Sequence, residues 1–369
     1  MTRPDQRPSR HRSASNPPPR IRRLRLRSPR VRATLALLVA TIAALGACEH
    51  ARLAPGHAGM DSATGGSSDA PSRPPPAPDP RPPPRTSPAL ASSAAVPSPA
   101  PSVAALPSPD RYAWLGDEGY AGPVPDDTLE SRFPDPAGAH RVALETQSFG
   151  AWLRGLPLAA PDTPVRSHTG RELHPVGDPR VAAVVAIDVG TADLQQCADA
   201  VLRLHAEWRW SQGHRDLAYQ AASGLALPFS RYARGERVVA QGNRLEWKAV
   251  GRAGQSHRAF RSYLDMVFAW ANTVSVARQA RPVAASELRP GDFFILPGNP
   301  GHSVLVLDLA ESADGQLYAL LGQSYMPAQN VHVLKPPGGG TWWTLELGEP
   351  VATPFWRPFP WESLRRLPD

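Results

Sequence analysis

Four residues of the chain could together form a nucleophilic centre: Cys197, Gln196, His302 and Gln323. A thiol becomes a strong nucleophile when a nearby imidazole takes its proton and the positive end of a helix dipole stabilises the thiolate. A polar side chain such as that of Gln323 can orient the imidazole and complete a triad. The amide of Gln196 could donate to a developing oxyanion. These residue types predict a Cys-His-Gln hydrolytic site if the fold brings them together.

A helix is expected to carry the cysteine. Residues 181–189 form a continuous apolar run typical of a buried strand, and the helical pattern starts directly after it. Asp193 is the expected N-cap, with Gln196 three residues later as in a capping box. Apolar residues then recur at helical spacing from Leu194 to Trp208, and Cys197 is one of them. The thiol is therefore expected in the first turn.

A strand hairpin is expected to carry the imidazole and the amide. Residues 257–278 are predicted to form a second helix. Residues 288–296 are then expected to form a turn that leads into a strand, followed by a loop over 297–301. Residues 302–309 and 317–323 are predicted to be the two strands of the hairpin. Antiparallel pairing then puts His302 opposite Ser324 or Gln323, so the third site residue is one of these or another polar neighbour.

Two resemblances follow from these segments. The order of a cysteine on a helix, Pro290-Gly-Asp-Phe-Phe294, Gly301-His302 and a polar residue on the next strand resembles the NlpC-like and CHAP-like branch of papain-fold cysteine peptidases and amidases. This resemblance implies an α+β fold with a helix that carries the cysteine packed on an antiparallel sheet, plus a helical insertion. It also implies cleavage of peptide or amide bonds in bacterial cell walls.

Longer segments are similar to a bacterial family, domain of unknown function 4846, whose members are exported lipoproteins without an assigned reaction. The similarity runs in order from about residue 149 to residue 367. The segments that carry it are 148–157 (SFGAWLRGLP), 193–200 (DLQQCADA), 263–268 (YLDMVF), 300–304 (PGHSV) and 323–329 (QSYMPAQ).

A purely structural interpretation of the same residues remains open. Cysteine is often buried as a small apolar side chain, and Cys197 shares its stripe with Leu194 and Val201. The carboxylates of Asp193 and Asp199 would oppose thiolate formation if they lie close to the sulfur. The alternative function is therefore a non-catalytic papain-like scaffold or binding lipoprotein.

The N-terminal third has the composition of an exported, anchored protein. Residues 1–47 are Arg-rich and then apolar, as in a signal peptide, and Leu45-Gly-Ala-Cys48 resembles a bacterial lipobox, which implies a lipid on Cys48. A single anchor helix and an ordinary secretory signal are the alternatives. Residues 48–110 are rich in Pro, Ala and Ser and are expected to form a disordered tether. Residues 111–369 are expected to fold as one globular α+β domain.

Composition and spacing exclude several other classes. Residues 1–47 hold eleven arginines and one aspartate, so cleavage changes the net charge from +7 to −3 and removes the argument for nucleic acid. No zinc-type spacing or phosphate-binding loop is present, so no metal or cofactor is expected. The expected partners are the membrane, through Cys48, and cell-wall peptide, with the domain a monomer. Glu49 favours the outer over the inner membrane, and the Trp-rich segment 342–361 is expected to cover the core or to stack on sugars.

Overall fold

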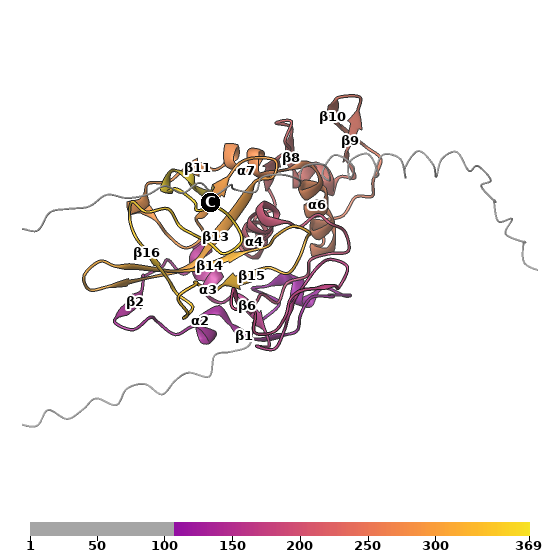
Figure 1. Cartoon of the computed structure of the whole chain (residues 1–369). Helices are drawn as coiled ribbons and strands as arrows, with labels where there is room; N and C mark the ends of the chain where they lie inside the picture. The colour runs from indigo at the N-terminus through magenta and orange to yellow at the C-terminus, as the bar shows by residue number, and fades with distance from the viewer. Residues whose placement is uncertain (1–106) are drawn as a thin grey trace, which may run out of the picture. The chain divides into compact units, whose positions relative to one another are not determined.

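The computed structural model describes residues 107–369. The expected signal peptide (1–47), Cys48 and most of the expected tether (48–110) lie outside these residues. The fold is a mixed α/β arrangement with an open antiparallel sheet and few helices (Figure 1). This agrees with the α+β class expected from the sequence; its papain-like detail stays a prediction.

The largest sheet has nine strands, and every neighbouring pair in it is antiparallel. Its order is β11-β17-β12-β13-β14-β15-β6, with β16 paired to β14 and β2 paired to β13. The strands are β2 (Ala139–Arg141), β6 (Val181–Val184), β11 (Arg281–Pro282), β12 (Phe293–Leu296), β13 (His302–Ser312), β14 (Leu317–Gln323), β15 (His332–Leu334), β16 (Trp343–Leu345) and β17 (Leu364–Arg366).

Four two-stranded ribbons and a set of mostly short helices complete the described part. The ribbons are β1 (Pro125–Thr128) with β3 (Pro157–Ala159), β4 (Val165–Arg166) with β5 (Glu172–His174), β7 (Ala218–Gln220) with β8 (Ala226–Pro228), and β9 (Arg237–Gln241) with β10 (Arg244–Lys248). The α-helices are α2 (Leu129–Arg132), α3 (Phe149–Arg154), α4 (Cys197–Ser211), α5 (Phe229–Ala233), α6 (His257–Trp270) and α7 (Thr273–Gln279). The 3-10 helices are η1 (Ala113–Gly116), η2 (Ala285–Glu287) and η3 (Trp361–Ser363).

The central strand β13 separates two apolar cores because successive side chains of a strand point to opposite faces. Leu305 and Leu307 belong to the core that includes the buried face of α4, and Val304 and Val306 belong to the core on the other face. Helix α4 lies against β13 and β14 (Figure 1). The main sheet and α4 are therefore the elements that position the expected site.

The helix that carries the cysteine begins three residues later than predicted. Asp193 does not cap it, because its Oδ1 accepts hydrogen bonds from the amide of Ala328 (2.6 Å) and from Nε2 of Gln196 (3.0 Å). Gln196 is the N-cap instead, and its backbone N–H donates to Oδ2 of Asp199 at 3.1 Å. Cys197 is thus the first residue of α4 and still lies in the first turn.

The predicted helix over 257–278 was wrong as a single element. The backbone is extended at Ala271 and Asn272, so α6 ends at Trp270 and a separate helix, α7, begins at Thr273. The side chain of Asn272 accepts a hydrogen bond from the amide of Ser275 at 3.0 Å, which caps α7. A capped second helix is more stable here than continuation of the first, since Asn is a poor residue for a helix interior.

Candidate active site

The thiol of Cys197 lies against the backbone on both sides of His302. Its Sγ donates to the carbonyl oxygen of Gly301 at 3.7 Å, and the backbone amide of Ser303 hydrogen-bonds to the sulfur. Residues 197 and 301 lie far apart in the chain, so the folded sheet creates this contact. It brings the beginning of α4 to the beginning of β13.

The imidazole of His302 is held by the predicted amide. Nε2 of His302 lies 2.8 Å from Oε1 of Gln323, and both side chains are buried. The two residues are diagonal neighbours rather than opposite ones. Beyond a bulge between Val306 and Asp308, the register pairs Leu305 with Gly322. The two side chains can still form a hydrogen bond because His302 and Gln323 lie on the same face of the sheet.

The second ring nitrogen of His302 is unsatisfied. Its Nδ1 is buried and has no hydrogen-bond partner within residues 107–369. Most buried polar atoms in folded proteins are hydrogen-bonded, so such an atom calls for a functional explanation. No hydrogen bond joins the Cys197 thiol to this nitrogen in the described part of the chain, since the thiol donates to Gly301 instead.

Burial keeps both reactive groups neutral at pH 7. Loss of solvent, and then the negative charge of Asp199, raise the pKa of Cys197 to about 12. Loss of solvent lowers the pKa of His302 to about 4, although its hydrogen bond to Gln323 acts in the opposite direction. At rest Cys197 is therefore a thiol and His302 a neutral imidazole, rather than a thiolate and an imidazolium. Attack by such a thiol requires removal of its proton during the reaction.

Aromatic side chains cover the imidazole. The ring centroid of His302 lies 5.0 Å from that of Tyr325, 5.1 Å from that of Trp356 and 6.0 Å from that of Phe359. His302 itself is fully buried. The Trp-rich segment therefore covers part of the core here, which is one of the two roles expected for it.

The side chain of Gln196 is already engaged. Its Nε2 donates to Oδ1 of Asp193 at 3.0 Å at the surface. An amide that served an oxyanion would have to leave this carboxylate first. The backbone N–H groups of Cys197 and Ala198 need no such rearrangement, because the first amides of a helix have no acceptor within it and the capping box engages those of Gln196 and Asp199.

A small cavity of about 290 Å³ opens beside the sulfur. Cys197, Asn272, Asn299 and Met326 are among the residues that line it. Thr273 and Gly298 also line it and are joined by two hydrogen bonds: Thr273 Oγ1 donates to the carbonyl of Gly298 and accepts from its amide, both at 3.2 Å. The cavity is large enough for a side chain or a short segment of a substrate.

Comparison with known families gives one match. The family described as Domain of unknown function (4846) matches residues 129–366, which include both ends of the site. The chain belongs to this family. No curated protein and no solved structure matches the chain.

Sequence reasoning missed two parts of the site that this family domain contains. The first is the α6–α7 break at Asn272, whose only signal was an asparagine inside an apolar helical pattern. The second is His332, whose Nε2 lies 3.3 Å from Nε2 of Gln323. His332 is the first residue of a three-residue strand, too short for its pairing with Gln323 to be read from the sequence.

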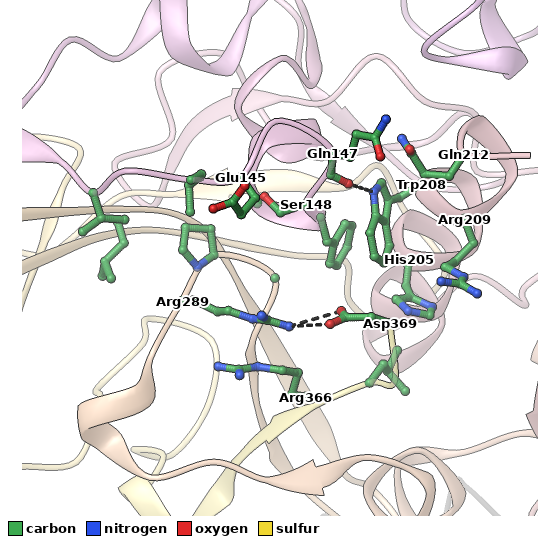
Figure 2. A pocket seen from close by; sticks show the side chains of 18 of the residues that line it. Glu145, Gln147, Ser148, His205, Trp208, Arg209, Gln212, Arg289, Arg366 and Asp369 are labelled. Carbon is green, nitrogen blue, oxygen red and sulfur yellow. Dashed lines mark hydrogen bonds and ion pairs between the residues drawn. The ribbon is translucent and has the colours of Figure 1, made fainter. Parts of the chain in front are cut away.

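A second pocket, of about 640 Å³, lies apart from these residues (Figure 2). Figure 2 shows Arg289 and Asp369 pointing toward one another across it, with Nη2 of Arg289 3.0 Å from Oδ2 of Asp369. His205 and Trp208 of α4 form another part of its wall. Neither Cys197 nor His302 lines it, so it is separate from the Cys197–His302 site.

Two further features concern the described residues only. Among residues 107–369, no three His, Cys, Asp or Glu side chains come together in a way that could hold a metal ion. No helix in this part of the chain is long and apolar enough to cross a membrane.

Proposed function

We propose that the domain is a cysteine hydrolase that cleaves an amide or ester bond, with Cys197 as nucleophile and His302 as general base. The observation that carries the proposal is the position of the thiol between the backbone of Gly301 and that of Ser303, the two residues that flank His302. The Nδ1 atom of His302 is itself buried and has no hydrogen-bond partner among residues 107–369. Gln323 orients the ring through Nε2.

The reaction begins when the Cys197 side chain rotates from Gly301 toward Nδ1 of His302. The thiol proton moves to Nδ1 while Sγ forms a bond to the substrate carbonyl carbon, and the carbonyl electrons move to the oxygen. The first amides of α4, assisted by Gln196 if it is released, donate to that oxyanion. The carbon–nitrogen or carbon–oxygen bond then breaks, and the leaving group takes the proton from His302.

Water completes the turnover. It adds to the thioester carbonyl as His302 accepts its proton, the carbon–sulfur bond breaks, and the acid product leaves with the thiol restored. Because the resting thiol and imidazole are both neutral, this base-assisted route fits the site better than attack by a preformed thiolate.

The proposal extends to substrate and location. The resemblance to papain-fold peptidases and amidases favours a peptide of the cell wall as the substrate. The lipobox-like segment before Cys48 favours a lipid-anchored domain on the periplasmic side of the envelope, with the outer membrane ahead of the inner one. Mass spectrometry of the exported protein would detect or exclude the lipid on Cys48.

One observation favours a second candidate function, a non-catalytic scaffold. Cys197 is only 5% exposed and its pKa is raised to about 12, as in a cysteine that serves packing. A scaffold of this kind would tolerate replacement of Cys197 by alanine with its cellular function intact.

Alkylation of the full-length protein separates the two candidates. Iodoacetamide is added to the wild type and to H302A, and the rate of modification of the peptide that contains Cys197 is followed by mass spectrometry, with C48A variants keeping Cys197 as the one thiol. The hydrolase requires the rate in H302A to fall at least about tenfold, since general bases contribute about 10²–10⁴-fold. Slow modification of Cys197 at the same rate in the wild type and in H302A would favour the scaffold. The variant H205A controls for loss of a buried histidine outside the site.

A further inference from the structure

Gln323 on β14 lies between two buried histidines, one on each of the flanking strands β13 and β15. Its Oε1 is 2.8 Å from Nε2 of His302, and its Nε2 is 3.3 Å from Nε2 of His332. Gln323 and His332 are register partners in the β14–β15 pair. Both histidines are fully buried and the glutamine is 2% exposed, so bulk water does not compete for these hydrogen bonds.

The direction of each hydrogen bond between these three side chains is set by the backbone carbonyl of Asn330, which contacts His332. Nδ1 of His332 lies 3.0 Å from the carbonyl oxygen of Asn330, and a carbonyl oxygen only accepts, so Nδ1 of His332 carries the proton. In a neutral imidazole the other nitrogen is then an acceptor. Nε2 of His332 therefore faces the NH₂ group of Gln323 rather than its oxygen.

The same logic continues to the site. With its NH₂ group on His332, Gln323 presents Oε1 to His302, and Nε2 of His302 must donate to it. A neutral His302 that is protonated on Nε2 has its lone pair on Nδ1, the nitrogen without a partner among residues 107–369. This is the tautomer that can accept a proton from a thiol.

We propose that His332 is a positioning residue, which fixes the amide of Gln323 and thereby keeps the lone pair of His302 on Nδ1. The functional meaning of this role rests on the proposed hydrolase, whereas the hydrogen bonds that set the tautomer do not depend on it. Without the acceptor on His332, the Gln323 amide can turn over and present NH₂ to His302. Nε2 of His302 would then accept, and Nδ1 would hold a proton and lose its capacity as a base.

Neighbouring side chains hold His332 in this orientation. Its ring centroid lies 5.8 Å from that of His174 and 5.9 Å from that of Phe355. His174 is in turn held by Asp178, with Nδ1 3.1 Å from Oδ2. Burial also lowers the pKa of His332 to about 4, so the ring is neutral at pH 7, as the row of hydrogen bonds requires.

The test reads the tautomer directly in the full-length protein. Nitrogen-detected NMR of histidine-labelled protein at pH 7 distinguishes a ring that is protonated on Nε2 from one that is protonated on Nδ1. The wild type is expected to have His302 protonated on Nε2. H332L, which removes the acceptor, is expected to populate the Nδ1-protonated form, whereas H332Q, which retains one acceptor and one donor, keeps the wild-type form. H205L serves as the control, because His205 is equally buried but hydrogen-bonds to Tyr219 and Pro368 instead.

Alkylation of Cys197 gives the second readout. The rate at pH 7 is expected to fall at least about tenfold in H332L and to recover in H332Q, because the wrong histidine tautomer costs up to about 10⁴-fold in a related triad. Protonation of His302 on Nδ1 in the wild type overturns the proposal, and this measurement does not depend on whether H332L folds. An unchanged tautomer in folded H332L also overturns it. If the tautomer shifts as expected while Cys197 is unreactive in every protein, His332 keeps its role in setting the tautomer and the proposed hydrolase falls.

Discussion

The carbonyl oxygen of Gly301 lies 3.7 Å from Sγ of Cys197, although 104 residues separate the two in the chain. This contact depends on a residue without a side chain. A Cβ on residue 301 would lie 2.2 Å from Oγ1 of Thr273 and 2.8 Å from the carbonyl oxygen of Leu296. The close approach of α7, β12 and the loop before β13 therefore requires glycine at position 301.

The variant G301A should separate the first turn of α4, which carries Cys197, from the loop that precedes β13. Relief of these clashes is expected to move the 298–301 loop and to cost about 1–3 kcal/mol of unfolding free energy, as overpacking does. The rate of Cys197 alkylation should change with it. Urea unfolding and alkylation kinetics measure both effects. G338A is the matched control, since a Cβ at residue 338 meets no atom within 4 Å; an equal effect in the two variants would argue against a specific role for residue 301.

Replacement of Cys197 by alanine should abolish hydrolysis while the fold is kept. The side chain is buried but small, so the expected loss of unfolding free energy is about 1–2 kcal/mol. Denaturant unfolding and turnover of peptide amide substrates measure the two quantities. The hydrolase would be contradicted by C197A protein that folds normally and retains the full rate of turnover of the wild type.

Arg203 supports the segment before the cysteine from inside the core. It is fully buried, and its guanidinium bonds to Oδ1 of Asp188 (2.8 Å), Oε1 of Glu207 (2.9 Å) and Oε1 of Gln195 (2.9 Å). R203M leaves the two carboxylates without this partner, so we expect a loss of about 3–5 kcal/mol in unfolding free energy.

The control for R203M is R166M, which breaks the exposed ion pair between Arg166 and Glu172. Exposed ion pairs contribute about 0–1 kcal/mol, so this variant should unfold almost like the wild type. Comparable losses of unfolding free energy in R203M and R166M would show that the buried guanidinium of Arg203 stabilises the fold no more than an exposed one.

Stability should also depend on His257 in a defined direction. Burial opposes its charge, but hydrogen bonds and the charges of Glu207 (2.7 Å) and Asp117 (2.6 Å) raise its pKa above the usual 6.5. A raised pKa means that the folded state binds the proton more tightly than the unfolded state. The stabilisation is therefore complete below about pH 6.5 and is lost as the pH rises through the folded-state pKa.

The measurement is the difference in unfolding free energy between the wild type and H257Q across pH 5–9. We expect the difference to be largest at acidic pH and to shrink toward alkaline pH. A difference that grows with pH would show that the neutral ring is the one that the fold prefers.

The positions of Cys197, His302 and Gln323 relative to the elements that carry them could be predicted from local pattern alone. Helix and strand periodicity set the first turn of α4 and the two strands of the hairpin, and a hairpin has few possible registers. The break at Asn272 could not be predicted, because a single capping residue competes there with a strong apolar stripe. His332 could not be found either, since its contact with Gln323 depends on a pairing between β14 and β15 that no turn length defines.

The exact start of α4 was set by tertiary contacts as well. Asp193 has the chemistry of an N-cap, but the amide of Ala328, far along the chain, takes its carboxylate. Local propensity is a weak guide wherever a distant donor competes for the same side chain.

The aromatic cover of His302 has a consequence for where protons can go. Tyr325, Trp356 and Phe359 surround an imidazole that is fully buried, so the ring has no direct exchange with bulk water. A proton that His302 takes from the thiol can leave only to a group that enters the site, which in the proposed reaction is the departing amine or alcohol. The aromatic side chains would thus couple proton transfer by His302 to a molecule that enters the site, either a substrate or an alkylating reagent.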